Sequence, residues 1–102
     1  MTTDALVYAE KPNGYCAMRV KNLTIDGDVL LNSESPVSIE FEEGTIKTVT
    51  YSAPEKTNVT LQIGMNPKGI TLNGMKYKNW KYTQKRGLSI ILPAGEGVVG
   101  IR

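Results

Sequence analysis

Three segments alternate between apolar and polar residues, and this pattern constrains the fold more than any other feature. The segments are residues 36–42, 57–63 and 88–92. In the first, Val37, Ile39 and Phe41 occupy every second position, with polar side chains between them. Since successive side chains of a strand point to opposite faces, a period of two indicates a strand with one buried face. In the third segment, Ile91 makes the outer face partly apolar.

Turn dipeptides separate these segments from further strand-like stretches. The dipeptides are Asn13-Gly14, Asp26-Gly27, Glu43-Gly44 and Asn73-Gly74. Asn-Gly and Asp-Gly supply the positive φ that tight hairpin turns need. Additional strands are expected at residues 5–10, 15–21, 23–25, 29–31, 45–52, 69–72, 76–82 and 97–101. The phase change between Ile46 and the pair Val49 and Tyr51 predicts a β-bulge.

The predicted fold is all-β, with no helix, because no segment has apolar residues at helical spacing over three turns. About eight to nine short strands at this spacing favour an antiparallel β-sandwich over a barrel. The sandwich would be immunoglobulin-like or jelly-roll-like. Four of the five prolines, Pro36, Pro54, Pro67 and Pro93, are expected at strand margins. A length of 102 residues fits one domain, residues 1–102.

The side-chain inventory removes most routes to catalysis. The chain has no histidine, which excludes the commonest general base and metal ligand. Its one cysteine, Cys16, excludes an internal disulfide and is expected to be a buried filler. Glu40 and Glu42 share a strand face, but a solvated face explains them as well as a catalytic pair does. No catalytic residue, metal site or cofactor is assigned, and the chain is predicted not to be an enzyme.

The remaining signals say little about location. The N-terminus does not resemble a signal peptide, and no apolar run is long enough for a membrane helix. Asp26-Gly27-Asp28 has two oxygen ligands, but a hairpin turn explains it better than a calcium site. Localisation and oligomeric state are left open.

Charge is unevenly distributed although the net charge is only +2. Residues 1–55 hold nine acidic and four basic residues, a net of −5, and residues 56–102 hold one acidic and eight basic residues, a net of +7. Strand pairing between the halves would mix these charges, which we favour, whereas separation would create one basic face.

The basic residues concentrate in a run, residues 76–86, that also contains the only Trp and two of the five Tyr. As one uninterrupted strand, it would place Trp80 and Tyr82 on the same face as Lys76 and Lys78. Either Trp80 and Tyr82 lie in the core after a kink, or they stand outside beside the lysines. The sequence leaves both arrangements open.

If the rings are accessible, the run forms a flat binding platform. The candidate ligand-binding residues are Trp80, Tyr77, Tyr82, Lys78, Lys81 and Asn79. Aromatic rings can stack on the C–H face of a pyranose, while Lys and Asn side chains reach hydroxyl or acidic groups. Single-stranded nucleic acid could use similar groups, but a net charge of +2 makes it the weaker alternative.

A family resemblance supports a glycan-related function. Residues 69–82 and 87–96 form a strand ending in Asn-Gly, an aromatic second strand, and an amphipathic strand running into Pro-Ala-Gly-Glu. This last third of the chain resembles the C-terminal accessory β-sandwich domains of bacterial polysaccharide-degrading enzymes, glycoside hydrolases and polysaccharide lyases.

The resemblance implies a non-catalytic module that binds a polysaccharide or oligosaccharide, or packs on a neighbouring catalytic domain. It would place the chain in a secreted or cell-surface enzyme. It supplies no fixed binding triad, so the candidate residues come from ring chemistry alone. The alternative is a structural or protein-interaction sandwich whose aromatic residues lie in the core.

Overall fold

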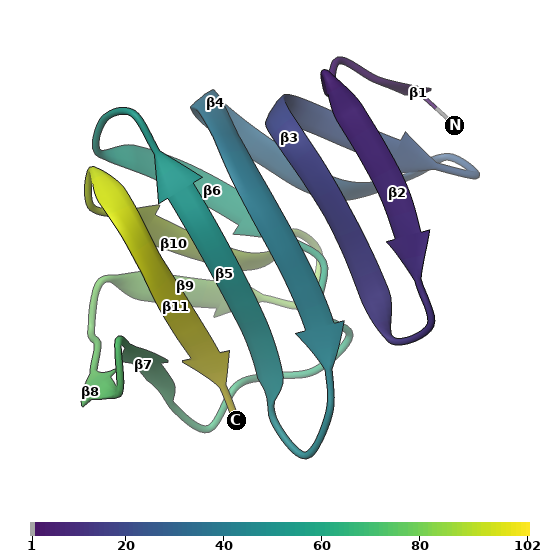
Figure 1. Ribbon diagram of the computed structural model, residues 1–102. Coiled ribbons are helices and arrows are strands. Elements are labelled where there is room, and N and C mark those ends of the chain that lie inside the picture. Colours follow the sequence, from purple (N-terminus) through teal and green to yellow (C-terminus); the bar gives the residue numbers. More distant parts are fainter. Residues whose placement is uncertain (1) are drawn as a thin grey trace.

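The computed structural model describes residues 2–102, and side chains from Thr3 onward, as eleven antiparallel strands (Figure 1). They are β1 (Thr2–Thr3), β2 (Val7–Lys11), β3 (Gly14–Ile25), β4 (Asp28–Glu43), β5 (Lys47–Ala53), β6 (Thr57–Leu61), β7 (Ile70–Leu72), β8 (Met75–Lys76), β9 (Trp80–Thr83), β10 (Gly87–Leu92) and β11 (Gly95–Ile101). The described residues form no helix, and hence none that is long and apolar enough to cross a membrane. The prediction of an all-β, antiparallel fold is confirmed.

All strands belong to one sheet, and β4 determines its shape. Residues 31–33 of β4 pair with β6, whereas residues 38–43 pair with β5. The sheet therefore curls into a half-barrel whose two arms face each other (Figure 1). We call the long arm β2, β5, β11, β7 and β8 with the adjoining parts of β3 and β4. The short arm is β6, β10 and β9 with the first half of β4.

The corner between the arms is a long hairpin of β3 and β4. The sequence predicted four short strands here, and the structure joins them into two, of 12 and 16 residues. Asp26 and Gly27 form the predicted turn, with φ values of 52° and 84°. The β3–β4 register shifts between Ala17 and Val20, where Arg19 has φ 51°. Such bulges bend a strand, and this one lets the hairpin continue through the corner.

Pro36 lies inside β4 rather than at a strand margin, so this expectation was wrong. Pairing of β4 with β6 ends at Ser33, and pairing with β5 begins at Ser38. Pro36 occupies the interval in which β4 changes partner, and no residue is in register with it. Its missing N–H therefore costs no ladder hydrogen bond.

The bulge predicted for residues 45–52 was also wrong. The β4–β5 pairing keeps one register from Ser38 to Glu43. The apparent phase change arises because Ile46 lies before β5 begins and remains 40% exposed. Val49 and Tyr51 then alternate regularly into the core.

The core lies between the two arms. On the short arm, Leu31, Leu61 and Leu88 form one buried row across β4, β6 and β10. On the long arm, Ile39 and Tyr51 form a corresponding row across β4 and β5. The alternating segments of the sequence thus supply the core, as predicted.

Cys16 is not a buried filler, contrary to expectation. It is half-buried, whereas the next residue of β3, Ala17, is fully buried. Alternation along β3 turns Ala17 toward the core and Cys16 toward the outer face, in register with Glu40.

Strands from the two halves of the sequence pair with each other, as expected. The long arm joins β7, β8 and β11 of the basic half to β2 and β5 of the acidic half, and the short arm joins β6, β9 and β10 of the basic half to the first half of β4. Pairing across the halves occurs at β5–β11 and β4–β6.

Candidate ligand-binding site around Trp80

The segment from residue 76 to residue 82 is interrupted, and the predicted continuous strand was wrong. Strand β8 ends at Lys76 and β9 begins at Trp80. The Trp80 N–H donates to the Lys78 carbonyl oxygen over 2.9 Å. A bond between residues two apart closes a very tight turn, which changes the direction of the chain before β9.

Because β9 begins late, its aromatic residues face the core side. Trp80 is in register with the buried Ile90, and Tyr82 with the buried Leu88. Both rings are half-buried and pack against the core. Lys81, between them, is exposed. Of the two arrangements that the sequence left open, the structure shows the kinked one.

Three hydrogen bonds fix the segment between β8 and β9. The Trp80 Nε1–H donates to the Tyr77 carbonyl oxygen over 2.9 Å, and the Tyr77 hydroxyl donates to the Ile91 carbonyl oxygen. The Ile91 N–H donates to the Asn79 carbonyl oxygen over 3.0 Å. The polar atoms of two of the candidate rings are therefore used inside the protein.

A hollow of about 420 Å³ lies beside Trp80 on the short arm. Its polar lining comes from Asn58, Lys78, Asn79, Lys81 and Ser89. The Ser89 hydroxyl donates to Asn58 Oδ1 over 2.9 Å, which orients this amide. The hollow combines the apolar residues Trp80 and Ile91 with two amide groups, a hydroxyl group and two ammonium groups, and no carboxylate lines it.

The structure brings together four of the six predicted site residues. Trp80, Lys78, Asn79 and Lys81 line this hollow. Tyr77 instead lines a neighbouring hollow of about 370 Å³, which Trp80 and Lys78 also border. Tyr82 lines neither of the two.

Sequence reasoning missed Asn58 and Ser89. Each lies at an outward position of an alternating segment, so the period of two identified its face. What the sequence lacked was the order of the strands: β10 lies between β6 and β9, and this order brings residues 58, 80 and 89 together.

The chain matches no family model, no curated protein sequence and no solved structure.

The two carboxylates considered as a catalytic pair, Glu40 and Glu42, form ion pairs with Lys11. Lys11 Nζ lies 3.2 Å from Glu40 Oε1 and 2.9 Å from Glu42 Oε1, on the outer face of the long arm. The hydrogen bond from Lys11 lowers the pKa of Glu42, and the same bond raises the pKa of Lys11. Within residues 3–102, no three metal-ligating side chains gather into a potential metal site.

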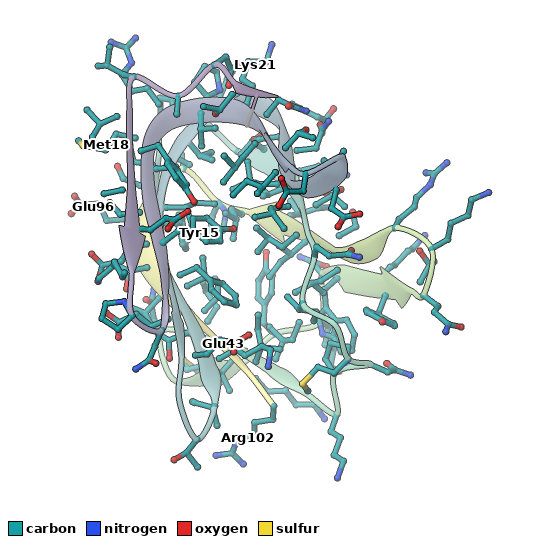
Figure 2. All side chains as sticks on the ribbon, turned by 90° about the vertical axis from the view of Figure 1, so that its right-hand side faces the viewer. Tyr15, Met18, Lys21, Glu43, Glu96 and Arg102 are labelled. Carbon is teal, nitrogen blue, oxygen red and sulfur yellow. The ribbon has the colours of Figure 1, made fainter. Side chains whose placement is uncertain are left out.

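Another cleft, of about 430 Å³, lies beside β2 and β3 at the open side of the curled sheet. The Tyr15 ring stacks on the Phe41 ring at 5.5 Å and lies 6.3 Å from the Tyr8 ring. Figure 2, which views this open side, shows Tyr15 pointing between the arms while Met18 and Glu96 point away from them. Burial raises the pKa of Tyr15 well above its ordinary range. The three rings come from three different strands, so no single segment of the sequence could indicate that they lie together.

Proposed function

We propose that this domain is a non-catalytic, carbohydrate-associated accessory module that contacts a glycan at the hollow beside Trp80. In this proposal the curled sheet functions as a small β-sandwich, of the immunoglobulin-like or jelly-roll-like kind. The observation that carries the proposal is the composition of the hollow, in which Trp80 and Ile91 lie beside Asn58, Lys78, Asn79 and Lys81.

These groups suit a polyhydroxylated ligand. Trp80 and the exposed Ile91 offer apolar surface to sugar C–H groups, and the amides of Asn58 and Asn79 can donate to and accept from hydroxyl groups. Lys78 and Lys81 supply charged donors to hydroxyl or acidic groups. A volume near 420 Å³ is within the range of small-molecule sites.

Affinity electrophoresis through gels containing neutral or acidic polysaccharides tests the proposal. Lys78→Ala should reduce the retardation of the wild type about tenfold, because a hydrogen bond to a charged group is lost. Lys85→Ala is the matched control: it removes the same charge from an exposed lysine that lies outside the hollow. No retardation on any polysaccharide, or equal losses for both variants, would contradict glycan binding here.

A second function is favoured by the internal hydrogen bonds of the aromatic residues. Trp80 and Tyr77 both direct their polar atoms into the protein, and their rings pack against the core. Rings used this way suit a structural or protein-interaction domain, for example one that packs on a neighbouring catalytic domain. In that case Lys78→Ala would leave all polysaccharide mobilities unchanged.

A further inference from the structure

Strand β2 is the longest free edge of the sheet. Its five residues, Val7–Lys11, pair with β3 on one side and with no described strand on the other. The other free edges are formed by β1 and β8, with two residues each, and by β9, with four. β2 is the right-hand strand of the front layer in Figure 1, and β11 is the left-hand one. A free edge presents unpaired N–H and C=O groups that can pair with another chain.

The hairpin geometry shows which groups are free. A two-residue turn joins β2 to β3. Lys11 and Gly14 flank this turn and form the pair that closes it, in which each residue bonds to the other through its main chain. Because bonded and non-bonded pairs alternate, Val7 and Ala9 also bond to β3. Tyr8 and Glu10 therefore direct their N–H and C=O groups outward from the sheet.

Little protects this edge. The pairing of β2 with β3 has no bulge, and the strand contains no proline. A free lysine on an edge strand would disfavour pairing with another chain, but the charge of Lys11 is paired with Glu40 and Glu42 on the outer face. Edges that avoid association usually carry a bulge, a proline or a charged side chain, and of these β2 keeps only the exposed Glu10, on its core-facing side.

We propose that β2 pairs with β2 of a second copy of this chain, antiparallel and with the twofold axis at Ala9. In this register the outward N–H and C=O groups of Tyr8 meet those of Glu10 of the second copy, on both sides of the axis. The contact thus gains four main-chain hydrogen bonds, and the two Ala9 residues face each other as a non-bonded pair.

The side chains favour this register over one centred on Glu10. With the axis at Ala9, Tyr8 lies beside Glu10 of the second copy on the core-facing side, where a phenol can donate to a carboxylate. On the outer side, the 48%-exposed Val7 lies beside the aliphatic stem of Lys11 of the second copy. An axis at Glu10 would instead place two carboxylates directly opposite each other, which is destabilising.

The pairing joins two long arms into one continuous sheet and leaves the short arms outside. An edge of five residues buries far less area than the roughly 1,600 Å² of a standard interface. The dimer is therefore weak and depends on protein concentration. Both Trp80 hollows stay accessible in it, because Trp80 lies on the short arm.

Disulfide cross-linking tests the register directly. Ala9→Cys is made together with Cys16→Ala, since Cys16 is the β3 partner of residue 9 and would otherwise capture the new thiol. Facing residues of a non-bonded antiparallel pair have Cα atoms about 4.5 Å apart, which a disulfide can span. Residue 9 is exposed, so the substitution leaves the core intact.

The control is Val7→Cys with the same Cys16→Ala background. Residue 7 is also exposed and on the same face, but the proposed axis separates the two copies of it by roughly 14 Å. Under mild oxidation Ala9→Cys should form covalent dimer at least about tenfold faster than Val7→Cys. Equal rates for the two variants would overturn the proposed register.

Analytical ultracentrifugation of the variants tests the edge itself. The mean mass of the wild type should rise with concentration. Glu10→Pro removes an outward N–H without breaking a bond to β3, and it should remain monomeric with an unchanged circular dichroism spectrum. Glu10→Gln keeps that N–H and should still associate. A wild type that is monomeric at every concentration, or a Glu10→Pro variant that associates like it, would refute pairing through β2.

Discussion

The indole N–H of Trp80 donates to the carbonyl oxygen of Tyr77, three residues earlier, over 2.9 Å. This bond, and the one from the Tyr77 hydroxyl to Ile91, tie the irregular segment to β10. We expect Trp80→Phe to cost about 1 kcal/mol of unfolding free energy, since a ring remains but the hydrogen bond is lost. Trp80→Ala should cost about 2–3 kcal/mol because half-buried packing is lost as well. Urea denaturation followed by circular dichroism measures both losses. Similar stabilities for Trp80→Ala and the wild type would show that the ring contributes nothing to the core.

Gly14 should tolerate no side chain. A Cβ atom built on it would lie 1.7 Å from the Phe41 carbonyl oxygen, on the neighbouring strand β4. The Phe41 carbonyl oxygen belongs to the backbone of a strand that pairs with β3, so it cannot move away freely. Gly14→Ala should therefore push β3 and β4 apart and lower the unfolding free energy by about 3 kcal/mol or more. Gly69→Ala is the matched control, since nothing lies within 4 Å of its Cβ position. Its unfolding free energy should stay within about 0.5 kcal/mol of the wild type. Equal effects of the two substitutions in thermal unfolding would contradict the close β3–β4 approach.

The sequence predicted the elements of this fold better than their connections. Alternation at residues 57–63 and 88–92 correctly placed Val59 and Ile90 in the core, because the period of a strand is local information. It could not show that β4 continues through Pro36, because a proline is tolerated there only where the partner strand changes. It also could not predict the turn at Lys78, which depends on hydrogen bonds to β10.

The same limit applies to the candidate site. Lys78, Asn79, Trp80 and Lys81 are close in sequence, so a single segment was sufficient to group them. Asn58 reaches the hollow only through the order of β6, β10 and β9, and that order follows from long-range pairing.

Asp4 should contribute to stability in a pH-dependent way. Its Oδ1 accepts hydrogen bonds from the N–H groups of Asn22 and Lys21, both at 2.9 Å, and these bonds lower the pKa of the carboxyl group. A lowered folded pKa means that the stabilisation is complete above the ordinary value of 3.8 and is lost as pH falls through the lower folded value. Asp4→Asn should therefore be less stable than the wild type at neutral pH. Urea titrations over a pH series should show the difference shrinking in acid; a constant difference would rule out the ionised carboxylate as its source.

Lys11 should control the titration of Glu42 with little effect on stability. In Lys11→Met the pKa of Glu42 should rise toward its ordinary value of 4.5, because the hydrogen bond and positive charge that lower it are lost. The unfolding free energy should change little, since the ion pair is at the surface. Carboxyl chemical shifts in an NMR pH titration report the change, with Lys47→Met as a control that removes a lysine 3.7 Å from Glu43 instead. An unchanged Glu42 titration would mean that the ion pair is not formed in solution.

Because β4 runs through both arms, neither arm can detach while this strand keeps its place. The domain should therefore lose its structure as one cooperative unit, without a half-folded species in which one arm survives. Amides near Leu31 and Phe41, at opposite ends of the shared strand, should exchange their hydrogens with the same opening free energy. For a module attached to a larger protein, such behaviour would leave proteases no partly opened form to attack.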